Sequence, residues 1–296
     1  MSDLAEYYTK KRTFWGGQFS GPNPISFVSD VVGKTLQMKL LDLFSGGKSV
    51  ARIAETLGYE VTTLDIDKNT NPTVCANVLD FNYKSHFEPG DFNVVWASPP
   101  CDTFTAARRS NIGRMVHNEM MTSERIIFDR ETLGVPLLRR TQEIIEYLQP
   151  KVWFIENPYT GSMKNYITEK PAVFDYCMFG FEYRKRTAVW SNVPLESVMC
   201  DGSHLIDGRH RRSAIGTSTS GIPGQGGGRN KKGRYAIPEN LVKSLRQSSL
   251  REKHSVIVSS LEFLLGLLHY TLNTPIHLNY YYYYYYYIRY IYTYLK

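Results

Sequence analysis

Residues 38–49 read Met-Lys-Leu-Leu-Asp-Leu-Phe-Ser-Gly-Gly-Lys-Ser, and this stretch decides the predicted fold. Its apolar run, Lys39 to Phe44, is closed by Ser45-Gly-Gly47. Apolar residues then recur at helical spacing, at positions 50, 53, 54 and 57, and Gly58 stands where a C-terminal cap belongs. The pattern predicts a strand, a glycine turn and a helix.

The same alternation continues along the chain. Further strands are predicted over residues 60–65, 92–97, 152–155 and 187–190, with a polar, arginine-rich loop and then a helix over 137–148 between the second and third of them. Such βαβ alternation predicts an α/β fold with a mostly parallel, doubly wound sheet. Ligands of such sheets bind at the carboxyl ends of the strands.

Composition and charge limit the possible classes of protein. The 296 residues are 42% hydrophobic and 21% charged, which excludes a mainly disordered or collagen-like chain. Four cysteines are too few for a disulfide scaffold, and the amino terminus lacks the apolar core of a secretion signal. We therefore expect an intracellular protein.

The net charge of +7 is concentrated in one stretch. Residues 1–199 carry 22 basic and 23 acidic side chains, whereas residues 200–250 carry 9 and 3. The predicted organisation is an N-terminal extension (1–37), an α/β domain (38–199), a basic Gly/Arg-rich loop (200–237), a returning helix (238–250) and an apolar, tyrosine-rich, low-complexity tail (251–296). The apolar run at 255–270 is shorter than the roughly 20 residues of a membrane span, so no membrane association is expected.

The glycine turn suits a nucleoside-containing ligand. Its backbone, at Ser45, Gly46 and Gly47, allows close approach at a helix N-terminus, and the first glycine of a Walker motif is missing. Around it we assign four side chains to the ligand: Phe44 and Ile66 against the two faces of adenine, Asp65 to the ribose hydroxyls and Asn77 to the adenine edge. Asp42 belongs to the same predicted site.

Two clusters at later strand ends carry the predicted chemistry. Ser98-Pro-Pro-Cys101 fixes a thiol at the mouth of the sheet, and the positive charge of Arg108 and Arg109 is expected to favour its thiolate. Glu156-Asn-Pro158 closes the next strand, and a buried, protonated Glu156 could donate a hydrogen bond to a ring nitrogen.

Asp42 to Gly47, Asp65, Pro100-Cys101, Glu156-Asn157 and Arg184-Lys-Arg186 together resemble the motifs of cytosine-C5 DNA methyltransferases, in family order, over residues 38–195. The resemblance is closest to compact members from phages and large DNA viruses. It implies a Rossmann-like methyltransferase fold, S-adenosylmethionine as cofactor, with Pro99 and Pro100 lining its site, and DNA as partner of a monomeric enzyme.

The resemblance also implies a mechanism. Cys101 attacks C6 of an extruded cytosine, Glu156 holds and protonates N3, and C5 receives the methyl group. Asn157 positions the catalytic loop, and either Arg184 or Arg186 contacts the cytosine O2 or the thiolate side of the pocket. Lys48 departs from the family's usual Gly-x-Gly pattern and is expected to crowd the methionine end of the cofactor.

Three other functions remain open at this point. A cytosine-C5 enzyme could act on tRNA, whose loop bases are already unstacked. An amino-methyltransferase for cytosine N4 or adenine N6 would carry tyrosine in place of Cys101. A non-catalytic nucleic-acid-binding relative would retain DNA affinity without binding the cofactor.

The target-contacting loop (200–237), which follows the catalytic domain (38–199), is predicted to contact DNA phosphates through its basic residues. They are Arg209, Arg211, Arg212, Arg229, Lys231, Lys232 and Arg234. Arg108 and Arg109, within the catalytic domain, are also predicted to contact DNA. Cys200, His204 and His210 resemble part of a zinc site, but no fourth ligand is nearby and the spacing matches no common site. The sequence therefore predicts no metal, and Cys75 and Cys177 are assigned to the core.

Overall fold

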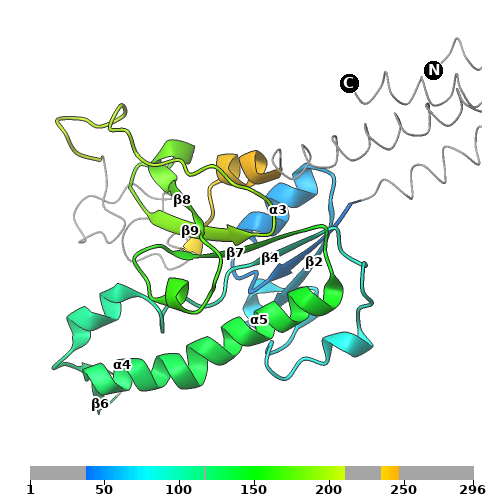
Figure 1. Ribbon diagram of the computed structural model, residues 1–296, viewed down its shortest axis with the longest axis horizontal. Helices are drawn as coiled ribbons and strands as arrows, with labels where there is room; N and C mark the ends of the chain where they lie inside the picture. The colour runs from blue at the N-terminus through cyan, green and yellow to red at the C-terminus, as the bar shows by residue number, and fades with distance from the viewer. Residues whose placement is uncertain (1–37, 117, 211–234, 247–296) are drawn as a thin grey trace, which may run out of the picture. The chain divides into compact units, whose positions relative to one another are not determined.

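The computed structural model describes residues 38–116, 118–210 and 235–246 (Figure 1). Seven strands form the main sheet in the order β3-β2-β1-β4-β7-β9-β8. Their bounds are β1 Lys39–Leu43, β2 Glu60–Asp65, β3 Val74–Cys75, β4 Val94–Ala97, β7 Val152–Pro158, β8 Ala172–Asp175 and β9 Arg186–Ser191. Strands β3 to β7 in this order pair in parallel, whereas β9 is antiparallel to both β7 and β8. The mostly parallel α/β sheet predicted from the sequence is confirmed.

Helices cover both faces of this sheet (Figure 1). Helix α5, Val135–Leu148, packs Leu138 and Leu148 against one face. Helix α3, Ser49–Thr56, and a helix over residues 239–246 pack against the other face. The predicted returning helix, 238–250, is observed over residues 239–246. Just before it, the Ile237 backbone N–H donates to Ser49 Oγ of α3 at 3.2 Å.

The β1 strand shows why the sequence folds this way. Four of its five residues are buried, since a strand at the centre of a parallel sheet is covered on both faces. Leu41 and Leu43 belong to the core under α5, and Leu40 belongs to the core under α3. Alternate side chains thus supply two separate cores.

The segment predicted as an arginine-rich loop contains regular structure. It holds the hairpin β5 Met115–Val116 and β6 Glu119–Met120, then helix α4 Ser123–Asp129 and a π-helical turn, η4 Arg130–Gly134, that leads into α5. The prediction of a loop was wrong here. The short 3-10 helices are η1 Lys68–Thr70, η2 Tyr83–Ser85, η3 Ala106–Asn111, η5 Met163–Asn165 and η6 Tyr176–Phe179.

Several predicted features lie outside the described residues. They are the N-terminal extension 1–37, most of the basic loop (211–234), the last part of the predicted returning helix (247–250) and the tail 251–296. Within the described part of the chain, every helix is too short or too polar to cross a membrane.

Candidate active site

The turn after β1 is held by three residues with left-handed backbone. Phe44, Gly46 and Lys48 have φ values of 60°, 44° and 56°. This path aims the Gly46 N–H at Asp65 Oδ2, which accepts it at 2.7 Å. The Asp67 N–H donates to the other oxygen, Asp65 Oδ1, at 2.8 Å. The ends of β1 and β2 are thereby joined, and the Asp65 carboxylate is fixed in orientation.

Two buried oxygen atoms at this turn lack a partner among the described residues. They are Asp42 Oδ2 and Ser45 Oγ. Burial, with a smaller contribution from the charge of Asp65, raises the pKa of Asp42 to about 8, although the Ala51 backbone N–H and Lys48 act in the opposite direction. A buried polar atom without a partner is costly, so these two atoms favour a polar ligand at the turn.

The other residues predicted to contact the nucleoside differ in how available their side chains are for binding. Phe44 is half-buried against the core, and Ile66 is 68% exposed. The Asn77 amide is already engaged, because Nδ2 donates to Asp80 Oδ2 at 2.7 Å and Oδ1 accepts from the Leu79 N–H at 3.2 Å. An adenine edge would have to displace one of these bonds.

Lys48 has a partner on the loop after β2. Its ammonium donates a hydrogen bond to the Asn71 carbonyl oxygen. The side chain therefore reaches across from the start of α3 to that loop.

The thiol loop between β4 and η3 is tightly held. The Cys101 carbonyl accepts hydrogen bonds from the backbone N–H groups of Phe104 and Thr105, at 3.1 and 2.8 Å. Pro99 is buried and Pro100 is exposed. Asn157 Nδ2, itself buried, donates to the Pro99 carbonyl at 2.9 Å. The end of β7 thus fixes the loop that carries the thiol.

Two glycines allow other segments to approach this loop. A Cβ atom on Gly134 would lie 2.2 Å from Thr103 Oγ1, and one on Gly161 would lie 3.1 Å from the Phe104 carbonyl oxygen. Gly161 precedes Ser162, whose backbone N–H donates to that same carbonyl at 2.9 Å. The loop is therefore packed between the start of α5 and the segment after β7.

Glu156 is the buried acid beside the thiol. It is 5% exposed, and its Oε1 accepts from the Tyr176 hydroxyl at 3.2 Å. The Lys185 ammonium lies 3.9 Å from the same oxygen and 4.8 Å from the centre of the Tyr176 ring. Glu156 thus sits between a hydroxyl donor and a cation.

The predicted activation of Cys101 by neighbouring arginines is wrong for the free protein. Burial raises the pKa of the thiol to about 11, the charge of Glu156 adds to the effect, and Lys185 opposes it. Arg108 instead forms an ion pair with Asp129, which also accepts from Arg125 Nε at 2.7 Å. The cation that acts on the thiol is therefore Lys185, which is not among the predicted site residues.

The two arginines offered as alternatives near the pocket lie in different surroundings. Arg186 donates two hydrogen bonds to the buried Asp175 carboxylate, at 2.9 and 2.8 Å. Arg184 is exposed. Lys185, the residue between them, is the one directed at Glu156.

Basic side chains line a hollow beside the thiol loop. The hollow has a volume of about 170 Å³, and Arg109, Arg130 and Lys164 contribute its cations. Of the basic residues predicted after the catalytic domain, Arg209 is exposed within the described part. The others, Arg211, Arg212, Arg229, Lys231, Lys232 and Arg234, lie outside the described residues.

The assignment of the two remaining cysteines to the core is half right. Cys75 is exposed at the end of β3, where its Sγ lies 3.8 Å from the Ile66 carbonyl oxygen. Cys177 is buried, but it lies beside Cys200 and two histidines.

No protein-family model matches the chain. The chain is 41% identical over 218 residues to a protein of Frog virus 3 (isolate Goorha) named "Probable DNA (cytosine-5)-methyltransferase", and the match spans 70% of this chain and 98% of that protein.

Solved structures that match the chain include a methyltransferase of Entamoeba histolytica (17% identity, TM-score 0.36) and a DNMT2 variant of Spodoptera frugiperda (14% identity, TM-score 0.34). Each match covers 55% of this chain, and 57% and 53% of the respective structures. The chain spans about half the length of these solved structures.

Proposed function

Because this chain belongs to the DNA (cytosine-5)-methyltransferases, we propose that it methylates C5 of cytosine in DNA, with S-adenosylmethionine as the methyl donor. One observation of the site carries the proposal. A thiol, a buried carboxylate and an ammonium group meet at the carboxyl ends of β4 and β7, and Asn157 ties the two strand ends together. These are the groups that a covalent reaction on a cytosine ring requires.

The turn after β1 supports the choice of cofactor. Asp42 and Ser45 offer buried oxygens that have no partner within the described part of the chain, and the fixed Asp65 carboxylate retains lone pairs for two ribose hydroxyls. Phe44, Gly46, Gly47 and Ile66 would complete the site. When bound, S-adenosylmethionine supplies the methyl group.

Residues of this chain carry out the reaction on the cytosine ring. Cys101 sulfur bonds to C6, and the displaced electron pair makes C5 nucleophilic enough to take the methyl group. Loss of the C5 proton to a base then lets the sulfur–C6 bond break, which releases the product and the thiolate. Glu156 would bind N3 and carry the proton that it shares with the ring.

The charge of Glu156 affects the ionisation of Cys101. Negative charge on Glu156 raises the thiol pKa, so contact of Glu156 with N3 of the base, which offsets that charge, would favour the thiolate. Lys185 stabilises negative charge on either residue and takes the place that the sequence assigned to Arg184 or Arg186.

DNA contacts are proposed for the basic hollow beside the thiol loop. Arg109, Arg130 and Lys164 could neutralise phosphates that flank an extruded cytosine. Arg108 is excluded from this set because its guanidinium is committed to Asp129.

The direct test is methyl transfer from labelled S-adenosylmethionine to duplex DNA, with tRNA in a parallel reaction. We expect 5-methylcytosine in the DNA, identified by nucleoside mass spectrometry and located by sequencing. Methylation confined to tRNA, an N4-methylcytosine or N6-methyladenine product, or no transfer at any salt concentration would each contradict the proposal.

Lys185→Met is expected to slow alkylation of Cys101 by iodoacetamide about three- to tenfold at pH 8 to 9. The thiolate is the reactive form, and loss of the nearby positive charge raises the thiol pKa further above about 11. Mass spectrometry of the Cys101 peptide measures the rate. Lys170→Met, at an exposed position, serves as control. An unchanged rate in Lys185→Met would show that this ammonium does not act on the thiol.

A further inference from the structure

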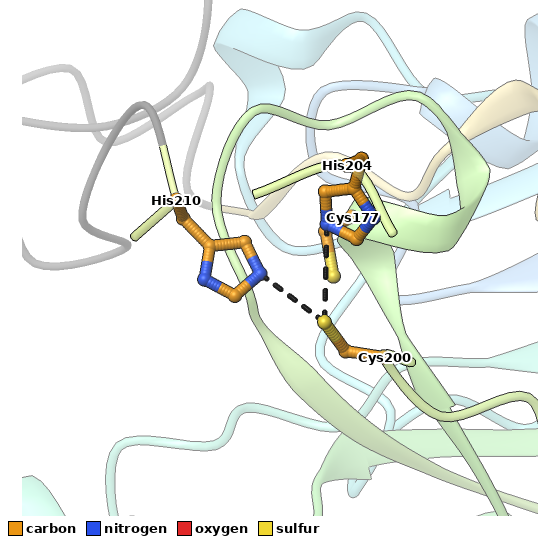
Figure 2. A group of neighbouring side chains, drawn as sticks. All are labelled: Cys177, Cys200, His204 and His210. Carbon is orange, nitrogen blue, oxygen red and sulfur yellow. Dashed lines mark hydrogen bonds between the residues drawn. The ribbon is translucent and has the colours of Figure 1, made fainter. Parts of the chain in front are cut away.

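Four potential metal ligands converge beyond the end of β8. Cys177 lies in η6, and Cys200, His204 and His210 lie in the segment after β9. Each offers one sulfur or nitrogen atom, and these atoms all lie within 4.8 Å of one another. Figure 2 shows the four side chains gathered around the Cys200 sulfur. The fourth ligand that the sequence around residue 200 lacks is thus supplied by Cys177.

The distances within this group, the Cys177 cluster, suit a tetrahedral ion. Cys200 Sγ lies 3.5 Å from His210 Nε2 and 3.8 Å from His204 Nε2 (Figure 2). Zinc bonds of about 2.3 Å to sulfur and 2.0–2.1 Å to nitrogen place tetrahedral S and N ligands about 3.5 Å apart. Both imidazoles turn the same nitrogen, Nε2, toward the sulfur.

Local turns bring the three later ligands together. The Cys200 N–H donates to Asp175 Oδ2 at 2.9 Å, which anchors the start of the segment to the end of β8. Asp207 and Gly208 have φ values of 50° and 72°, and around them Ile206 and Arg209 exchange two backbone hydrogen bonds of 3.0 Å. This tight hairpin turn returns His210 to Cys200.

The segment has little apolar burial of its own. Between Cys200 and His210, Leu205 is half-buried and Ile206 is 57% exposed. A segment with so few buried apolar groups gains little from packing, and a bound ion can supply the missing stabilisation.

We propose that Cys177, Cys200, His204 and His210 bind a structural Zn²⁺ ion. Two sulfur and two nitrogen ligands in a tetrahedron select zinc over calcium or magnesium, which prefer oxygen. Four protein ligands fill the coordination shell, so the site has no open position for a reacting molecule. Two thiolates also balance the charge of the ion.

The ion would join the segment to the active site through η6. Tyr176, the residue before Cys177, donates its hydroxyl to Glu156. A fixed Cys177 therefore helps to hold Tyr176 in place. The site also fixes the point from which the chain continues into Arg211 and Arg212.

Metal content of the full-length protein, expressed with zinc in the medium and purified without chelator, is the first test. We expect one zinc per chain. Replacement by Co²⁺ should give the visible bands of tetrahedral cobalt together with a sulfur-to-cobalt charge-transfer band. Absence of both zinc and a cobalt spectrum would overturn the proposal, as would a Cys177–Cys200 disulfide in the intact protein.

Single-ligand variants provide the second test. Cys177→Ser, Cys200→Ser and His210→Ala are each expected to weaken zinc binding by more than about tenfold, as measured by competition with a chromogenic chelator. Cys75→Ser, which removes an exposed thiol outside the cluster, should bind zinc as the parent does. Retention of full zinc affinity by the three variants would overturn the assignment. Circular dichroism of each variant, and of the parent after zinc removal and return, separates ligand loss from misfolding.

Discussion

Cys101→Ser should reduce methyl transfer to DNA by at least about 10³-fold, because a hydroxyl cannot replace the thiolate as the nucleophile at C6. The loop geometry should survive the change. Its hydrogen bonds use the Cys101 carbonyl and the Pro99 carbonyl, and neither involves the sulfur. The loss should therefore appear in kcat with little change in cofactor affinity, which calorimetry with S-adenosylmethionine would report.

DNA that contains 5-fluorocytosine gives a sharper readout of the same change. The fluorine blocks loss of the group at C5, so the parent protein should remain covalently attached to the DNA. Cys101→Ser should form no such complex, whereas Cys75→Ser should form it normally. An equal yield of complex in Cys101→Ser would rule out this residue as the nucleophile.

Glu156→Gln is expected to lower methyl transfer by about 10²- to 10³-fold while it accelerates alkylation of Cys101. The amide can still accept from Tyr176 but cannot carry a proton to N3. Because the charge of Glu156 raises the thiol pKa, its removal brings that pKa down from about 11 and increases the thiolate fraction at pH 8.

In a protein whose circular dichroism is unchanged, these opposite responses distinguish a catalytic acid from a residue needed only for packing. A disordered pocket would also lose methyl transfer and lower the thiol pKa, because burial is the largest cause of the raised value, but its circular dichroism would change. In Glu156→Gln, the midpoint of the alkylation rate against pH should move to lower pH. Glu146→Gln, at an exposed position on α5, should change neither quantity. An unchanged midpoint in Glu156→Gln would contradict the proposed effect of the Glu156 charge on the Cys101 thiol.

The central strands could be predicted because burial on both faces leaves a strong signal in the sequence. Leu40, Leu41 and Leu43 are apolar without interruption, and the turn that follows is marked by glycine. Helix α4 gave no comparable signal. Ile127 and Phe128 are 52% and 60% exposed, so its apolar residues do not form the one-sided stripe by which an amphipathic helix is recognised.

The candidate site was predictable as a set of strand ends but not in its finer assignments. Only Arg186 of the basic run at 184–186 lies in β9, so Arg184 and Lys185 do not follow the period of a strand. The sequence alone could therefore not reveal that Lys185 faces Glu156. The role of Cys177 was hidden for a different reason, since its partners lie in another segment and only folding brings the two together.

Three consecutive residues, 175–177, each make contacts with a different part of the protein. Asp175 accepts from Arg186 and from the Cys200 N–H, Tyr176 reaches Glu156, and Cys177 belongs to the cluster with two histidines. An inserted or deleted residue here would shift at least one of the three out of reach. Insertions and deletions are therefore not expected within this tripeptide. In homologous enzymes they should lie before or after it.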